Sequence, residues 1–155
     1  MSEHDLLKQG FLGTTAPLYA DVVLLLEIGM GVALLLGAFL ARVRKYRWHA
    51  ICQSTIVLLN LAVILTVMVP AFHPGVLSKL SDSTIRSYYW LSTVHGVLGI
   101  SAESLALYIL LVAGTRVLPQ RLRFRNYKFW MRGTVLLGWS VLVLSVATYV
   151  RWYVL

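Results

Sequence analysis

The chain has 155 residues, of which 59% are hydrophobic and only 13% are charged, and its formal net charge is +8. Soluble globular domains carry about 25% charged residues, so this composition excludes a soluble protein and indicates an integral membrane protein. The positive charge does not indicate a nucleic-acid partner, because most basic residues are grouped in short segments between long apolar stretches.

Four apolar stretches are each long enough to cross a bilayer as a helix, since about 20 helical residues span the ~30 Å hydrocarbon core. They cover residues 18–41, 48–72, 89–113 and 129–150. The predicted fold class is therefore all-α: a four-helix transmembrane bundle formed by residues 18–155, preceded by an N-terminal tail, residues 1–17. We do not expect this tail to be a cleaved signal peptide, because it opens with Glu3 and Asp5 rather than with basic residues.

The distribution of basic residues predicts the orientation in the membrane. Ten of the fourteen lysines and arginines lie in or beside the segments that join the first span to the second and the third to the fourth: Arg42, Arg44, Lys45, Arg47, Arg116, Arg121, Arg123, Arg125, Lys128 and Arg132. Basic loops stay in the cytoplasm, so both termini and the loop 74–88 are predicted to lie outside. The predicted location is the bacterial cytoplasmic (inner) membrane, with several passes.

The first predicted span has two patterned faces. Gly29, Ala33 and Gly37 recur at every fourth residue, a spacing that favours close helix packing. Glu27 projects about 160° away from them. An ionisable side chain inside a bilayer costs on the order of 3 kcal/mol, so Glu27 is interpreted either as a functional group or as a protonated residue hydrogen-bonded within the bundle.

The second predicted span has a histidine at each end, His49 and His73, which are 24 residues apart. A helix of that length covers roughly 36 Å, so the two histidines lie at opposite membrane surfaces and cannot share a ligand. His49, Gln53 and Asn60 fall on one face, which we expect to point into the bundle, with Asn60 as an interhelical hydrogen-bonding group. Pro70 is expected to kink or loosen the end of this helix.

The third predicted span carries His95 on nearly the same face as Gly99, Ala102 and Ala106. Small side chains beside a histidine would leave room for a haem against the helix, but tight helix packing produces the same pattern. Glu103 lies two turns below His95, near the middle of the bilayer. It is interpreted either as a partnered polar residue or as part of a proton path.

Several short motifs have a known counterpart: the sequence Tyr-Arg-Trp-His at 46–49, His73, Tyr88-Tyr89 followed by His95, Gly114, Trp139 and Tyr149. In these motifs the chain resembles a family of small four-helix bacterial membrane proteins that includes the CtaM-type factor required for cytochrome oxidase maturation. Members of that family usually carry a further histidine in the basic segment before the fourth span, and residues 123–128 contain none. The resemblance therefore leaves only His73 and His95 as a possible pair.

The resemblance implies a non-enzymatic accessory or assembly protein of a respiratory membrane complex of the cytochrome oxidase type. Its partners would be the lipid bilayer and other membrane subunits. His73 and His95 are the candidate cofactor-binding residues at the outer face. Haem is favoured over copper, because the two histidines differ in depth and a haem between them tolerates that difference.

Two alternatives remain open. One is a cofactor-free scaffold subunit of a larger energy-transducing membrane complex. The other, less supported, is a quinone- or haem-dependent oxidoreductase that uses His95 and Glu27. The sequence contains no phosphate-binding glycine loop and no nucleophile motif, so no enzymatic activity is predicted from the residues themselves.

Overall fold

The computed structural model describes residues 10–70, 72, 86–114 and 126–155. The described residues form helices α2 (Leu18–Arg42), α3 (Tyr46–Val63), α5 (Arg86–Gly114) and α6 (Tyr127–Tyr153), and α3 continues into a short π-helix, η1 (Ile64–Met68). Four helical spans are long and apolar enough to cross a membrane: Leu18–Arg42, Tyr46–Met68, Tyr89–Gly114 and Lys128–Tyr153. This confirms the predicted all-α fold with four transmembrane helices.

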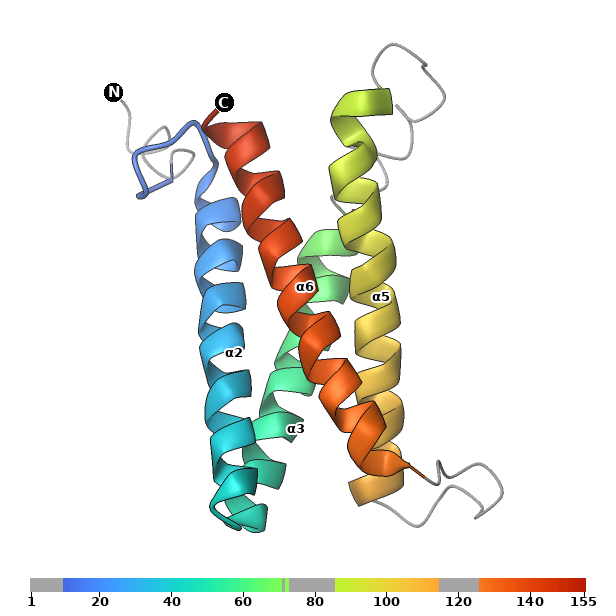
Figure 1. The fold of residues 1–155 in the computed structure, drawn as a ribbon. Helices are drawn as coiled ribbons and strands as arrows, with labels where there is room; N and C mark the ends of the chain where they lie inside the picture. Colours follow the sequence, from blue (N-terminus) through green and yellow to red (C-terminus); the bar gives the residue numbers. More distant parts are fainter. Residues whose placement is uncertain (1–9, 71, 73–85, 115–125) are drawn as a thin grey trace.

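The helices form two antiparallel pairs, α2 with α3 and α5 with α6 (Figure 1). Helix α6 runs obliquely across the bundle and contacts α2 as well as α5, whereas the contact between α3 and α5 is less extensive. The beginning of α2 and the end of α6 lie at one end of the bundle. The α2–α3 turn and the beginning of α6 lie at the other end (Figure 1).

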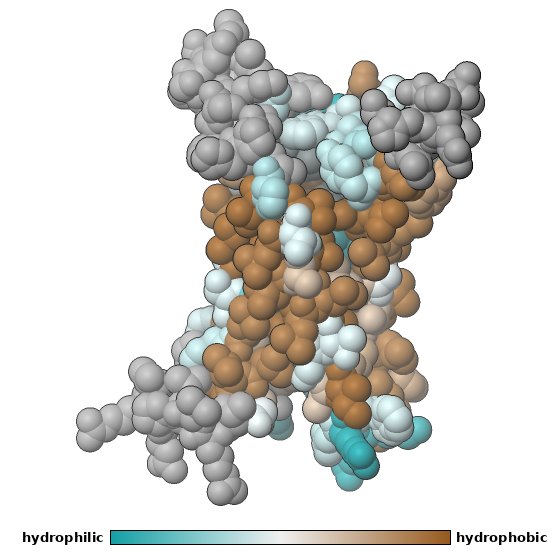
Figure 2. Space-filling model, turned by 180° about the vertical axis from the view of Figure 1, so that it is seen from behind, coloured by the Kyte–Doolittle hydropathy of each residue, from teal (hydrophilic) through white to brown (hydrophobic). Residues whose placement is uncertain are grey.

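The surface of the bundle matches a bilayer. Figure 2 shows an apolar band over the middle of the molecule and more polar residues towards both ends. Large apolar side chains are exposed on every helix, for example Val32, Leu58, Val97 and Leu136. Such a surface is stable against lipid hydrocarbon, because the bilayer removes the cost of exposing apolar groups to water.

The turn between α2 and α3 is tight and has the hydrogen bonds of a Schellman motif. The N–H of Lys45 donates to the carbonyl of Leu40 at 2.9 Å, and that of Arg44 donates to the carbonyl of Ala41 at 3.1 Å. Arg44 has a φ of 61°, in the left-handed region. Glycine is the usual residue at this position, because a residue with a Cβ pays about 1 kcal/mol or more for this conformation.

The π-helix η1 precedes Pro70 by one turn. Proline has no N–H and its ring clashes with the carbonyl of the residue four positions earlier, here Thr66, so Pro70 cannot make the usual α-helical hydrogen bond. A π-helix widens the turn: the N–H of Val69 donates to the carbonyl of Ile64, five residues back. The loosening that Pro70 predicts therefore takes the form of a π-helical turn.

Candidate functional site

Two hydrogen bonds between polar side chains inside the spans connect neighbouring helices. The side-chain amide of Asn60 on α3 donates to Glu103 Oε2 on α5 at 2.7 Å. Glu103 is buried, with 6% of its surface exposed, and its second oxygen, Oε1, has no hydrogen-bond partner among the described residues. The pair connects α3 with α5 where those helices have little other contact. Asn60 is thus the interhelical hydrogen-bonding group that the sequence indicates.

Glu27 connects α2 with α6. The hydroxyl of Ser145 on α6 donates to Glu27 Oε2, and the carboxyl group is buried. Deeper along the same contact, a Cβ built on Gly31 would lie 2.5 Å from the side chain of Leu142 and 3.8 Å from that of Trp139. Gly31 is therefore the residue that lets α6 approach α2 closely. Its role is not evident from the sequence pattern, because Gly31 falls outside the four-residue spacing of Gly29, Ala33 and Gly37.

Sequence reasoning also missed a cluster around Asp21 at the beginning of α2. Asp21 is fully buried, and its carboxylate accepts hydrogen bonds from the hydroxyl of Tyr149 at 2.5 Å and from the N–H of Leu12 at 2.9 Å. Thr14 lies 2.7 Å from the Tyr149 hydroxyl, and Thr15 donates to the carbonyl of Tyr153 at 3.0 Å. Residues 10–17 are therefore folded onto the end of α6. The partners are more than 120 residues apart, so no local pattern could reveal the contact.

The three small residues of α2 do not share one environment. A Cβ on Gly37 would lie 2.2 Å from the amide nitrogen of Gln53 on α3, and the carbonyl of Ala33 accepts a hydrogen bond from the Cys52 thiol at 3.4 Å. Gly29 is exposed, and a Cβ there would meet no atom within 4 Å. Gly37 and Ala33 thus face α3, while Gly29 lies at an open surface of α2.

His95 on α5 is tied to the backbone of α6. Its Nδ1 lies 3.2 Å from the carbonyl oxygen of Val141. A carbonyl can only accept, so Nδ1 carries the hydrogen and the neutral ring keeps its lone pair on Nε2. His49 is held in the same way at the other end of the bundle, where its Nδ1 lies 2.8 Å from the carbonyl oxygen of Gly37.

One of the small residues near His95 packs against a neighbouring helix. A Cβ on Gly99 would lie 3.8 Å from Val141 Cγ1, so this part of α5 packs against α6. Ala102 and Ala106 are half-buried. The face that a haem would need beside His95 is therefore occupied at Gly99 by a neighbouring helix.

The second candidate ligand, His73, lies outside the described residues, so the structure does not bring it together with His95. Among the residues that the structure describes, no group of three or more His, Cys, Asp or Glu side chains could hold a metal ion.

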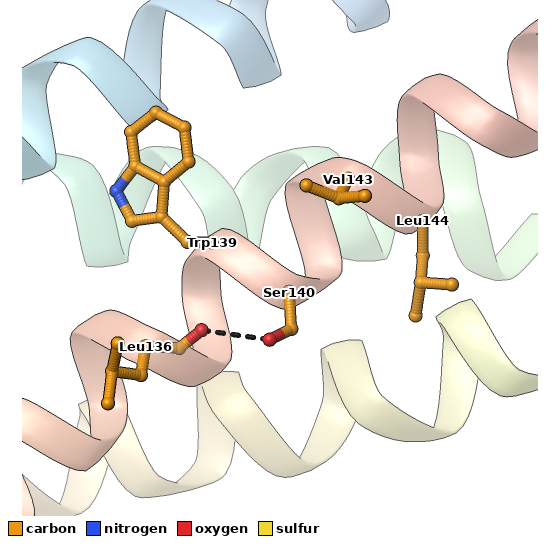
Figure 3. A pocket seen from close by; sticks show the side chains of 5 residues that line it. All are labelled: Leu136, Trp139, Ser140, Val143 and Leu144. Atoms are coloured by element: carbon orange, nitrogen blue, oxygen red, sulfur yellow. Dashed lines mark hydrogen bonds between the residues drawn. The ribbon is translucent and has the colours of Figure 1, made fainter.

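A hollow of about 510 Å³ lies open along α6, lined by Leu136, Trp139, Ser140, Val143 and Leu144 (Figure 3). The Ser140 hydroxyl donates to the carbonyl of Leu136 in its own helix, and the ring of Trp139 points towards α2 (Figure 3). No titratable side chain lines the hollow, so it offers an apolar surface and no acid, base or nucleophile.

Comparison of the chain with protein-family models, with curated proteins and with solved structures finds no match. The functional argument therefore depends on the residues and their geometry.

Proposed function

We propose that this chain is a non-enzymatic accessory or assembly protein of a respiratory membrane complex of the cytochrome oxidase type, in a bacterial cytoplasmic membrane. It acts by binding other membrane subunits through its helices. The respiratory assignment rests on the motif resemblance, and the mode of action rests on the structure.

The observation that supports helix binding is an exposed stripe on α2, which we call the outer stripe of α2. Its residues are Val22, Leu25, Gly29, Val32 and Leu36. They follow one another at alternating steps of three and four residues, the spacing by which one helix packs along another. Gly29 lies in the middle of the stripe with no neighbour within 4 Å, so the backbone of a second transmembrane helix can approach closely there.

Chemistry is less well supported than binding. Each described buried acid accepts a hydrogen bond from another residue of the bundle, and the hollow described along α6 is apolar. An enzyme needs groups that are free to meet a substrate. This arrangement favours a partner protein over the oxidoreductase alternative that uses His95 and Glu27.

Haem at the outer face is the finer part of the proposal, and one observation supports it. Metal-binding histidines usually donate their other ring N–H to a carbonyl or carboxylate, as His95 does to Val141. In this finer proposal haem binds through Nε2 of His95, and His73 is the candidate for a second ligand. The packing of Gly99 against Val141 favours the cofactor-free scaffold instead.

The test of partner binding is purification of the tagged chain from membranes in mild detergent, followed by identification of co-purifying subunits. We expect subunits of a terminal oxidase with the unaltered chain and their loss with Gly29→Leu. The matched control is Ala38→Leu, which places the same leucine side chain at an exposed position about 180° round α2. Equal recovery of the oxidase subunits with both variants would contradict the proposed interface, and their absence from the unaltered complex would contradict the respiratory assignment.

Haem is tested separately by the absorption spectrum of the purified chain with and without added haem. A Soret band lost in His95→Ala and retained in His49→Ala would assign the ligand. His49 is a suitable control because its ring is held by a backbone carbonyl in the same manner at the opposite end of the bundle. If neither the unaltered chain nor any variant shows a Soret band, the cofactor-free scaffold becomes the favoured function.

A further inference from the structure

Six basic side chains are exposed at the end of the bundle that carries the α2–α3 turn and the beginning of α6. They are Arg42, Arg44, Lys45, Arg47, Lys128 and Arg132. We call this surface the basic end. Its position is visible in Figure 1, where the α2–α3 turn and the first turns of α6 lie at the same, lower end of the bundle, on opposite sides of it.

The described part of the chain provides no counter-charge for the basic end. Its three acidic residues, Asp21, Glu27 and Glu103, are all buried, and each accepts hydrogen bonds inside the bundle from a neutral side chain. The six cations therefore face outwards with their charge uncompensated by any carboxylate that the structure describes.

Aromatic side chains show the depth at which these cations lie. Tyr46, Trp48 and Phe129 are 64%, 62% and 70% exposed and surround the same end of the bundle. Exposed Tyr and Trp side chains at the end of a transmembrane helix lie at the level of the lipid headgroups. Arg132 lies five residues after the first residue of α6, and a long basic side chain at that depth can extend to the level of the headgroups. The cations are thus placed at the height of the lipid phosphates.

Arg44 provides an independent sign that positive charge matters here. It takes the left-handed conformation at the end of the Schellman motif, where glycine would fit without strain. Folding alone would favour glycine at this position. The residue present instead places a guanidinium group at the tip of the turn, between Arg42 and Lys45.

We propose that the basic end binds the phosphates of anionic phospholipids. Arg42, Arg44, Lys45 and Arg47 on the turn and Lys128 and Arg132 on α6 are exposed at one end of the bundle, so several lipid headgroups in the membrane plane can pair with them. Each cation near an anionic membrane surface strengthens association by about fivefold. This lipid layer fixes the depth and tilt of the bundle, so that the outer stripe of α2 is presented at a constant height.

The test uses the full chain in phosphatidylcholine bilayers with a trace of spin-labelled phosphatidylglycerol or spin-labelled phosphatidylcholine. Electron spin resonance measures the fraction of each labelled lipid that the protein immobilises, and the ratio gives the preference for the anionic lipid. We expect a preference that weakens at high salt, because exposed charges are screened. Replacing Arg42, Arg44, Lys45 and Arg47 together by Gln should reduce this preference strongly and leave only the part that Lys128 and Arg132 contribute.

Arg44→Gly separates binding from folding. Glycine removes both the charge and the cost of the left-handed conformation, so the unfolding temperature in neutral detergent should stay the same or rise while the lipid preference falls by about fivefold. Arg151→Gln, at the opposite end of the bundle, is the control and should leave the preference unchanged. Equal immobilisation of the two lipids by the unaltered chain would overturn the proposal. The basic end would then be assigned to binding an acidic surface of a partner protein. A preference that is unchanged when Arg42, Arg44, Lys45 and Arg47 are all replaced by Gln would also overturn it.

Discussion

Asn60 and Glu103 are joined by a 2.7 Å hydrogen bond between α3 and α5, and this bond connects the α2–α3 pair with the α5–α6 pair inside the membrane. Glu103 is buried with one oxygen bonded and the other without a partner among the described residues. A buried charge without a counter-ion would be costly in this position, so we infer that the carboxyl group is protonated and acts as a neutral hydrogen-bonding group.

We expect Asn60→Ala to lower the free energy of unfolding by about 0.6 to 1.7 kcal/mol, the range measured for interhelical hydrogen bonds in membranes. Glu103→Gln keeps an acceptor for the Asn60 amide, so its effect should be smaller than that of Asn60→Ala. Unfolding in mixed micelles measures both, and Thr55→Ala, at an exposed position on α3, is the control. A larger loss with Glu103→Gln than with Asn60→Ala would indicate an ionised carboxylate and favour a proton path.

The Asp21 cluster leads to a prediction for the segment before α2. Tyr149→Phe removes the hydroxyl that donates to Asp21 and contacts Thr14, and leaves the fully buried carboxylate with the N–H of Leu12. A buried polar group that loses a partner costs about 1–3 kcal/mol, so the variant should unfold more easily.

Residues 10–17 should also become more sensitive to protease in Tyr149→Phe. Tyr19→Phe is the control, because Tyr19 is 54% exposed and lies on the same helix as Asp21. Equal protease sensitivity of the two variants would show that the segment is held by other contacts, such as those between Thr15 and Tyr153.

The number and type of helices could be predicted from the sequence, because a bilayer demands about 20 apolar residues per span and allows no unpaired backbone groups. The predicted spans 18–41 and 89–113 correspond to α2 and α5 within a few residues at each end. The second span was expected to run to residue 72 with its end kinked or loosened by Pro70, and a π-helical turn lies directly before that end.

Contacts between helices could be predicted only in part. The depth of a polar residue predicts that it needs a partner, as for Glu27 and Asn60, but not which residue provides it. Glu27 pairs with Ser145, a residue without any distinguishing local pattern. Spacing alone could not show that Gly31 rather than Gly29 faces α6, since that depends on how α2 is rotated in the bundle.

Gly29 and Gly31 provide a matched pair to test this rotation. Leu at position 31 would overlap the side chain of Leu142, so Gly31→Leu should cost about 1–3 kcal/mol or prevent folding. Gly29→Leu adds the same bulk at an exposed position and replaces glycine by a better helix former, so the isolated chain should be as stable or more stable.

The measurement is the fraction of folded monomer and its unfolding temperature in mild detergent. Loss of the folded monomer in Gly29→Leu, with Gly31→Leu tolerated, would require the opposite rotation of α2.

The last prediction concerns orientation. Thr15 donates from both its N–H and its hydroxyl to the carbonyl of Tyr153, so the beginning of the first span and the end of the last lie at the same end of the bundle, on one side of the membrane. The basic end lies on the other side. Because basic segments remain in the cytoplasm, we expect the chain's C-terminus outside and the α2–α3 turn inside.

Two measurements check this orientation. A periplasmic reporter such as alkaline phosphatase should be active when fused after Leu155. Lys45→Cys, in a chain with Cys52→Ser, should react with a membrane-impermeant maleimide only after the cells are permeabilised. Serine is a suitable replacement for Cys52, because the one described hydrogen bond of the thiol goes to the carbonyl of Ala33. A serine hydroxyl can donate to the same carbonyl. Labelling of Lys45→Cys in intact cells together with an inactive reporter would reverse the orientation. The basic end would then meet the lipids of the outer leaflet, and His95 would lie in the cytoplasmic half of the membrane.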